Sequence, residues 1–149
     1  MARYVVTVRT PRTPQAAFDY MADLRNFAAW DPGVVRVTQV EGSGGGPEAS
    51  FDVVVKAWPR DSTLRYVTEQ YRSPDLVVVA ARGKVLSSVD RITTTAAMPA
   101  GCLVTYEAEL SLNGVLSWAS FLLVPIFKRI GDRAAKGLTA VLEGEALPS

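Results

Sequence analysis

The residue of this chain with the clearest capacity for chemistry is Asp90, in the segment Ser88-Val89-Asp90. The 149 residues include no histidine, so proton transfer can use only carboxylates, phenols, lysines or water, and Ser-His-Asp and Cys-His systems are excluded. On the inward face of a strand, Asp90 would lose hydration and its pKa would rise, so that it could act as a general acid or base or bind a ligand hydroxyl. The alternative is a structural role, in which Asp90 pairs with Arg82, Arg91 or a backbone donor.

Two phenols are the next candidates. Tyr66 and Tyr106 could orient a ligand carbonyl through their hydroxyls, although such tyrosines are more often core residues with a polar tip. Cys102 is the single cysteine, which excludes an internal disulfide and a Cys-rich zinc site, and no histidine is available to activate it. The run from Gly42 to Gly46 lacks the GxxxxGK[ST] pattern of a phosphate loop. We therefore expect no metal and no cofactor.

The composition describes one globular domain, covering residues 1–149. Lys+Arg 16 against Asp+Glu 15 gives a net charge of +1, which provides no field for binding nucleic acid or an anionic membrane. The first residues lack the apolar run of a secretion signal, and the charge-free stretch from Leu112 to Phe127 is shorter than the roughly 20 residues of a spanning helix. We expect a cytoplasmic protein without stable membrane insertion.

The hydrophobic pattern predicts an α+β fold around these residues. A strand from Tyr4 to Arg9 precedes a helix with Thr13 as N-cap and Pro14 at its first position, ending near Arg25, and a short helical turn continues to Trp30. About six strands in hairpin succession are then predicted, in the segments Val34 to Val40, Phe51 to Trp58, Leu64 to Glu69, Leu76 to Arg82, a strand through Asp90 and Ile92, and Cys102 to Leu112. Most show period-two alternation, whereas Leu76 to Arg82 is apolar on both sides and gives no information on its facing. After Gly114 the period becomes helical, with Pro125 expected to kink or split the final helix.

The facing of Asp90 depends on the pairing of the last two strands. A turn at Met98 to Gly101 would set Asp90, Ile92 and Thr94 roughly opposite Leu110, Ala108 and Tyr106. Directly opposed residues share a face of a sheet, so Asp90 would point inward together with this apolar row. A slip of one residue would instead turn Arg91 inward.

The chain resembles a known superfamily in its segments PRTPQAAFDYMADLRNFAAWDPGV, SVDRITTT and CLVTYEAELSLNG, followed by the Pro-interrupted helix. These are similar to the actinobacterial branch of the SRPBCC superfamily, the START-like, birch-pollen-allergen-like helix-grip group labelled polyketide cyclase/dehydrase and lipid transport. The likeness covers Tyr4 to about Leu142. It implies a seven-stranded curved antiparallel sheet wrapped on a long C-terminal helix, with two short helices between the first two strands and a cavity between sheet and helix.

The inward-facing residues would then line that cavity. From the sheet these are Phe51, Val53, Val55, Tyr66, Leu86, Ile92, Tyr106, Ala108 and Leu110, and from the helix Leu122, Phe127, Ile130 and Ala134. The Trp30-Asp31-Pro32 segment could place Trp30 as a gate at the mouth, or it could simply stop a helix, with Asp31 holding the turn. The alternative for the whole set is a filled core.

An apolar and aromatic wall suits a hydrophobic ligand, and few catalytic residue types are present. We therefore expect a non-enzymatic binder or carrier of a lipid, polyketide, isoprenoid or quinone. The rival hypothesis is a polyketide cyclase or dehydratase with Asp90 as general acid/base and Tyr66 or Tyr106 as polariser. A third hypothesis is an interaction module that forms a homodimer through the exposed part of the segment from Trp118 to Phe127.

Overall fold

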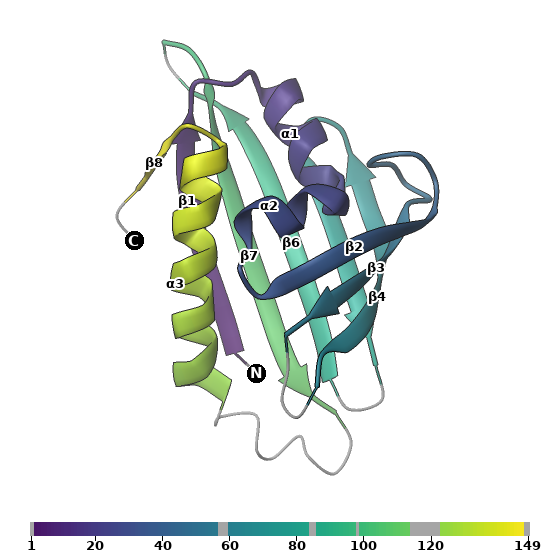
Figure 1. The fold of residues 1–149 in the computed structure, drawn as a ribbon. Helices are drawn as coiled ribbons and strands as arrows, with labels where there is room; N and C mark the ends of the chain where they lie inside the picture. The colour runs from purple at the N-terminus through teal and green to yellow at the C-terminus, as the bar shows by residue number, and fades with distance from the viewer. Residues whose placement is uncertain (1, 57–59, 84–85, 98, 114–122, 148–149) are drawn as a thin grey trace.

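The computed structural model describes residues 2–56, 60–83, 86–97, 99–113 and 123–147. Within these residues a single antiparallel sheet has the strand order β2-β3-β4-β5-β6-β7-β1-β8 and curves around a long helix (Figure 1). Its strands are β1 (Ala2–Thr10), β2 (Val34–Glu41), β3 (Ser50–Val55), β4 (Ser62–Arg72), β5 (Leu76–Arg82), β6 (Leu86–Ala96), β7 (Cys102–Leu112) and β8 (Glu145–Ala146). The predicted helix-grip α+β fold is confirmed.

The sheet has eight strands in the described part of the chain, one more than predicted. The additional strand β8 has only two residues, which pair with Val8 and Arg9 of β1. It forms because the chain reverses after the last helix at Glu143, whose φ is 53°, and at Gly144, where a Cβ would collide with the Arg9 carbonyl. A two-residue strand carries no alternation, so the pattern of hydrophobic residues could not reveal it.

The two predicted short helices follow β1 as α1 (Pro14–Ala22) and α2 (Phe27–Trp30). The first ends at Ala22, earlier than predicted, and a separate 3-10 turn, η1 (Leu24–Asn26), connects the two. The Thr13 hydroxyl accepts a hydrogen bond from the Ala16 N–H at 3.1 Å, and Pro14 occupies the first turn, where its missing N–H costs nothing. In Figure 1, α1 and α2 lie across the upper half of the concave face of the sheet. That half of the inner face is therefore covered, and the lower half is left free of these helices.

The long helix α3 (Leu123–Val141) packs along β1 and against α2. Pro125 lies in its first turn, so within the described residues the helix runs on without the expected interruption. A shorter helix before Pro125, and the predicted lining residue Leu122, fall outside the described residues. Among the described residues, we find no helix with the length and hydrophobicity required for crossing a bilayer.

Strands β6 and β7 settle the facing of Asp90. The observed pairs are Ser88 with Leu110, Asp90 with Ala108, Ile92 with Tyr106 and Thr94 with Val104, which is shifted by two residues from the predicted register. The strands pair as far as Ala96 and Cys102, and the Ala97 N–H donates to the Gly101 carbonyl, so the turn is centred one residue earlier than predicted. A two-residue shift preserves the side of the sheet, so Asp90 faces inward as predicted.

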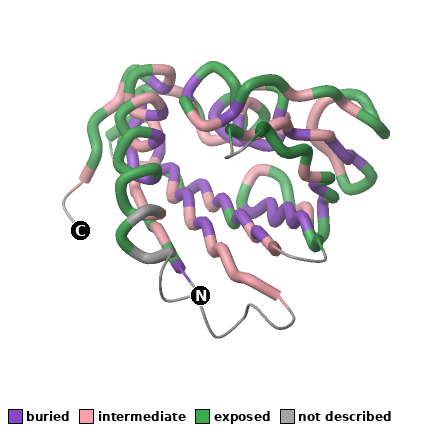
Figure 2. The backbone as a smooth tube through the Cα atoms, turned by 60° about the horizontal axis from the view of Figure 1, so that its bottom comes forward, coloured by how far each residue is buried: buried purple, intermediate pink, exposed green. Residues whose placement is uncertain are grey.

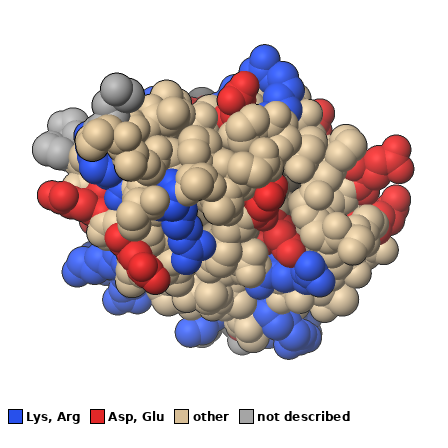
Figure 3. Space-filling model, turned by 90° about the horizontal axis from the view of Figure 1, so that it is seen from above, with Lys and Arg blue, Asp and Glu red and all other residues tan. Residues whose placement is uncertain are grey.

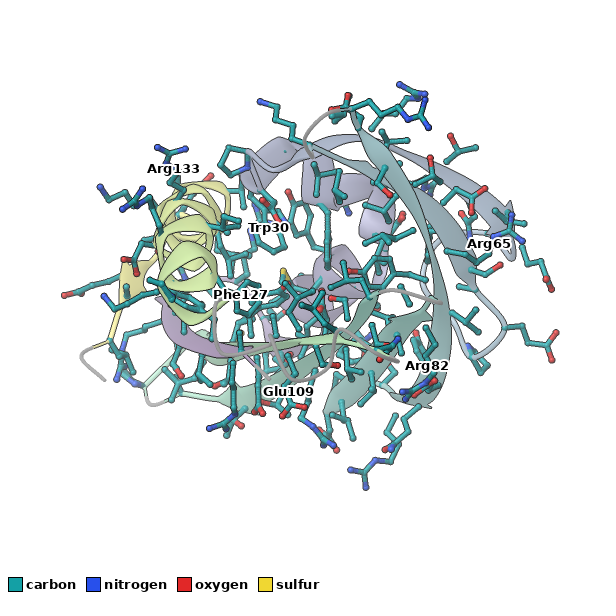
Figure 4. The ribbon with its side chains drawn as sticks, turned by 90° about the horizontal axis from the view of Figure 1, so that it is seen from below. Trp30, Arg65, Arg82, Glu109, Phe127 and Arg133 are labelled. Carbon is teal, nitrogen blue, oxygen red and sulfur yellow. The ribbon has the colours of Figure 1, made fainter. Side chains whose placement is uncertain are left out.

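The two faces of the sheet differ sharply in chemistry. Figure 2 shows buried positions alternating with more exposed ones along its strands. Ion pairs join neighbouring strands on the outer face: Arg3 with Glu107, Arg65 with Asp52 and Arg82 with Glu69. Figure 4 shows the labelled Arg65, Arg82 and Glu109 pointing away from the interior. The inner face is mostly apolar, so the polar groups that remain there require an explanation.

Candidate ligand cavity

A cavity of about 590 Å³ lies between the sheet and α3. Ten residues of the predicted site line it: Val53, Val55, Tyr66, Leu86, Asp90, Tyr106, Ala108, Leu110, Phe127 and Ile130. Figure 4 shows Phe127 pointing from α3 into the space between helix and sheet. Ile130 is 44% exposed, which places it at the rim.

Four of the predicted lining residues do not reach the cavity. Phe51, Ile92, Trp30 and Ala134 are buried in the packed core. On β3 and β6 the cavity is lined by residues of one end of the strand only. On β3, Val53 and Val55 line the cavity but Phe51 does not, and on β6, Leu86 and Asp90 line it but Ile92 does not. The end of the sheet under α1 and α2 is filled by those helices, and the opposite end is hollow.

Ten further residues, which were not predicted from the sequence, also line the cavity. They are Phe27, Asp31, Gly33, Val34, Lys56, Ser62, Thr63, Leu64, Gly83 and Ser88. Leu64 and Ser88 have the same strand parity as Tyr66 and Asp90, so alternation alone could have indicated them. Phe27, Asp31 and Gly33 arrive through the packing of α2 and the turn that follows it, which no periodicity reveals.

Four polar side chains of the cavity form one connected cluster: Tyr66, Ser88, Asp90 and Tyr106. The Tyr106 hydroxyl donates to Asp90 Oδ2 at 2.7 Å, and the Tyr66 hydroxyl donates to Ser88 Oγ at 2.9 Å. Ser88 Oγ in turn lies 3.4 Å from Asp90 Oδ1, a long contact. Tyr66, Asp90 and Tyr106 are the last residues on their strands to line the cavity before the packed core begins. The cluster therefore lies at the inner end of a mainly apolar space.

Asp90 is only 3% exposed, and this burial raises its pKa from 3.8 to about 7. The hydrogen bond from Tyr106 opposes the rise, and the negative charge of Asp31 adds to it. The proposed pairing with an arginine is wrong, because Arg82 binds Glu69 and Arg91 lies exposed on the opposite face of β6. At neutral pH Asp90 therefore exchanges between its neutral and ionised forms.

The two phenols remain protonated near neutral pH. Burial, with the Asp90 charge as the next cause, raises the pKa of both Tyr66 and Tyr106. Each hydroxyl is thus a permanent hydrogen-bond donor at the inner end of the cavity.

Trp30 and Asp31 have separate roles at the end of α2. Trp30 is 2% exposed and packs against Phe27 and Tyr106, with ring centroids 4.7 and 5.3 Å away, so it supports the cavity wall from behind. Asp31 ends the helix and accepts a hydrogen bond from the Gly33 N–H at 2.9 Å. It also lines the cavity, and burial raises its pKa. These positions fit the helix-stop interpretation of this segment.

The fold and the cavity define a helix-grip protein with an internal ligand space. The sequence profile of the family described as polyketide cyclase / dehydrase and lipid transport matches residues 1–143. The chain therefore belongs to this family.

Solved structures with the same fold resemble the chain over its length. An aromatase/cyclase, Zhui from Streptomyces sp. R1128, has a TM-score of 0.74 at 11% identity, covering 95% of this chain and 92% of that one. A START superfamily protein from Mycobacterium smegmatis has a TM-score of 0.72 at 10% identity, covering 96% and 98%. The two-domain aromatase/cyclase StfQ of the steffimycin pathway has a TM-score of 0.67 at 14% identity, covering 95% of this chain and 50% of that one, so the chain spans half its length. No curated protein matches. At these identities the likeness establishes the fold.

Proposed function

We propose that this protein binds and carries a hydrophobic small molecule, such as a lipid, polyketide, isoprenoid or quinone, in the cavity between the sheet and α3. The cavity itself carries the proposal. Its volume of about 590 Å³ is in the usual range for small-molecule sites, and its walls are mostly apolar, with one hydrogen-bonded polar cluster around Asp90. Such a space favours an apolar ligand that places one polar group against that cluster.

Filling the cavity is the direct test. Ala108 is 6% exposed and lines the cavity, so Ala108→Phe should introduce a ring into the ligand space. Nile red titrated into the wild type should show saturable, one-to-one fluorescence enhancement, and Ala108→Phe should weaken it by about tenfold or more, the effect of losing roughly 1.4 kcal/mol. Val67→Phe adds the same ring at a position that is 47% exposed, and should leave binding unchanged.

Native mass spectrometry of the purified protein, followed by solvent extraction, should reveal a co-purifying hydrophobic molecule. A wild type that binds neither Nile red nor any extractable lipid would defeat the proposal. Equal binding by wild type and Ala108→Phe would place the site elsewhere.

A second candidate is a cyclase or dehydratase, favoured by the burial of Asp90, which raises its pKa to about 7, and by its hydrogen bond from Tyr106. In this mechanism the Asp90 carboxylate removes a proton beside a substrate carbonyl, which accepts a hydrogen bond from Tyr66 or Tyr106. The protonated carboxyl then delivers that proton to a hydroxyl, which leaves as water, so the substrate loses one water overall.

The two candidates differ in what Asp90→Asn does. For a neutral polyketide substrate, the amide should retain binding while turnover falls by about 100-fold or more. Turnover at the wild-type rate in Asp90→Asn would remove this residue from the mechanism. A substrate that binds but is recovered unchanged from the wild type leaves the carrier as the function.

The surroundings of the site also bear on location and partners. We propose a cytoplasmic location, supported by the free and buried Cys102, since a lone buried thiol needs no oxidising compartment.

Figure 3 shows positive and negative side chains mixed over the upper face of the molecule, an arrangement unlike a nucleic-acid-binding patch. The proposed homodimer segment from Trp118 onward lies mainly outside the described residues and stays a prediction.

A further inference from the structure

Among the described residues of its wall, the cavity has acidic groups and no buried cation to neutralise them. Asp31 and Asp90 both line it, and the third charged residue in its wall, Lys56, is exposed at the rim. The ion pairs within the described part of the chain use other carboxylates: Asp23, Asp52, Glu69, Glu107 and Asp132. An unpaired carboxylate in an apolar space is unfavourable, so a ligand that supplies the missing positive charge gains free energy there.

The geometry leaves room for such a contact. Asp90 Oδ2 accepts the short hydrogen bond from Tyr106, whereas among the described residues Asp90 Oδ1 has only the 3.4 Å contact to Ser88. In Asp31, Oδ1 accepts from the Gly33 N–H. The two carboxylates lie on different elements, β6 and the turn after α2, and the charge of Asp31 acts on Asp90. A donor entering the cavity can thus be attracted by both.

Aromatic rings surround the same position. Phe27 and Tyr106 both line the cavity, with their ring centroids 6.3 Å apart in an edge-to-face arrangement. Aromatic faces attract cations, which adds to the effect of the carboxylates. A ligand carboxylate would instead meet two acidic groups, with no arginine or histidine in the described wall.

We propose that the cavity selects ligands whose polar end donates hydrogen bonds, and that it binds a lipophilic amine more tightly than an alcohol or a carboxylic acid of the same chain length. This inference rests on the proposed ligand-binding function and names the chemical class of its ligand. The ammonium binds at Asp90 Oδ1, where the negative charge of Asp31 adds to the attraction, and its alkyl chain lies along the apolar wall. An alcohol makes a neutral hydrogen bond at the same point and binds less tightly.

Proton linkage gives the inference a distinct signature. Ammonium binding requires ionised Asp90, whose pKa in the free protein is about 7, so amine affinity should rise as the pH increases to that value and level off above it. The titratable groups facing Asp90 are Tyr106 of β7, Tyr66 of β4 and Asp31, and both phenols stay protonated throughout. From α3 the lining residues are the uncharged Phe127 and Ile130.

The test is calorimetric titration of the wild type with decylamine, decanol and decanoate at pH 8, repeated with decylamine and decanol down to pH 5.5. We expect decylamine to bind about tenfold more tightly than decanol, since hydrogen bonds to charged groups exceed neutral ones by about 1–1.5 kcal/mol, and decanoate to bind most weakly. Below the pKa of Asp90, decylamine affinity should fall by about tenfold per pH unit, while decanol affinity changes far less.

Variants assign the effect to the cavity. Asp90→Asn should abolish the pH dependence of decylamine binding, and Asp31→Asn should weaken decylamine while sparing decanol. Asp52→Asn removes the same charge from the outer face and should match the wild type. If Asp90→Asn does not fold, the wild-type pH profile and Asp31→Asn still decide.

This inference would be overturned if decanol binds and decylamine binds no more tightly than decanol, or if the affinity for decylamine does not depend on pH. Either result would leave the proposed carrier function intact. Decanoate binding as tightly as decylamine would also overturn it. If all three ligands fail to bind, the carrier function itself falls, and this inference with it.

Discussion

Asp90 should make the stability of the protein depend on pH in a direction opposite to that of ordinary carboxylates. Its pKa is 3.8 in the unfolded chain and about 7 in the folded protein. Between these values the folded state holds a proton that the unfolded state has lost, so the free energy of unfolding falls as the pH rises. A difference of about 3 pKa units, at about 1.4 kcal/mol each, corresponds to a destabilisation of the folded state by about 4 kcal/mol. This destabilisation is absent below the pKa of the unfolded state and is fully present above pH 7.

The substitution Asp90→Asn removes this titration and leaves an amide oxygen to accept the Tyr106 hydrogen bond. We expect the variant and the wild type to have similar stability near pH 4, and the variant to gain up to about 4 kcal/mol relative to the wild type by pH 8. Urea unfolding at half-unit pH intervals measures the difference directly, because the titrations of all other groups are nearly the same in both proteins and cancel.

Asp52→Asn is the matched control. The hydrogen bond from Arg65 lowers the pKa of Asp52, so that carboxylate stabilises the fold as the pH rises through its titration. Removing it should change stability in the opposite direction from Asp90→Asn, and by less, since the pair is exposed. A stability difference between wild type and Asp90→Asn that is constant from pH 4 to pH 8 refutes the burial argument for Asp90.

Three other substitutions probe the same structure. Tyr106→Phe removes the hydrogen bond that holds down the pKa of Asp90, so a carboxyl NMR titration should give a midpoint above that of the wild type; an unchanged or lower midpoint would contradict the assigned role of Tyr106. Gly137→Ala places a Cβ against the Trp30 carbonyl where α3 meets α2, and should lower the thermal midpoint clearly, whereas a neutral effect would show that the helices separate freely. Thr13→Ala removes the N-cap of α1 and should cost about 1 kcal/mol in urea unfolding, with Thr13→Ser retaining most of that stability.

Which side of the sheet a residue faces could be predicted from the sequence. On β7, alternation predicted that Tyr106, Ala108 and Leu110 share the inner face, and even a register error of two residues left Asp90 on that face. The N-cap at Thr13 was equally accessible, because it is a local interaction within four residues.

How far along the inner face a residue lies could not be predicted. Phe51 and Val53 have the same parity on β3, yet one packs in the core and the other lines the cavity. The difference depends on where α1 and α2 cross the sheet, a tertiary arrangement that period-two alternation does not contain. The position of Asp31 in the cavity wall could not be predicted for a related reason. Its place before Pro32 in the sequence is fully explained by the end of a helix, so nothing local indicates a second role.

The cavity and its carboxylate both work against stability. The lower half of the inner face of the sheet lacks the side-chain packing of the upper half, which costs stability. Ionised Asp90 in addition destabilises the folded state above neutral pH. An apolar residue at this position would relieve that burden, and no arginine or lysine of the described chain forms an ion pair with Asp90. Charged groups that destabilise a fold without an ion-pair partner are characteristic of sites maintained for function. A ligand that donates to Asp90 reverses the effect, because binding then stabilises the ionised form that folding alone disfavours.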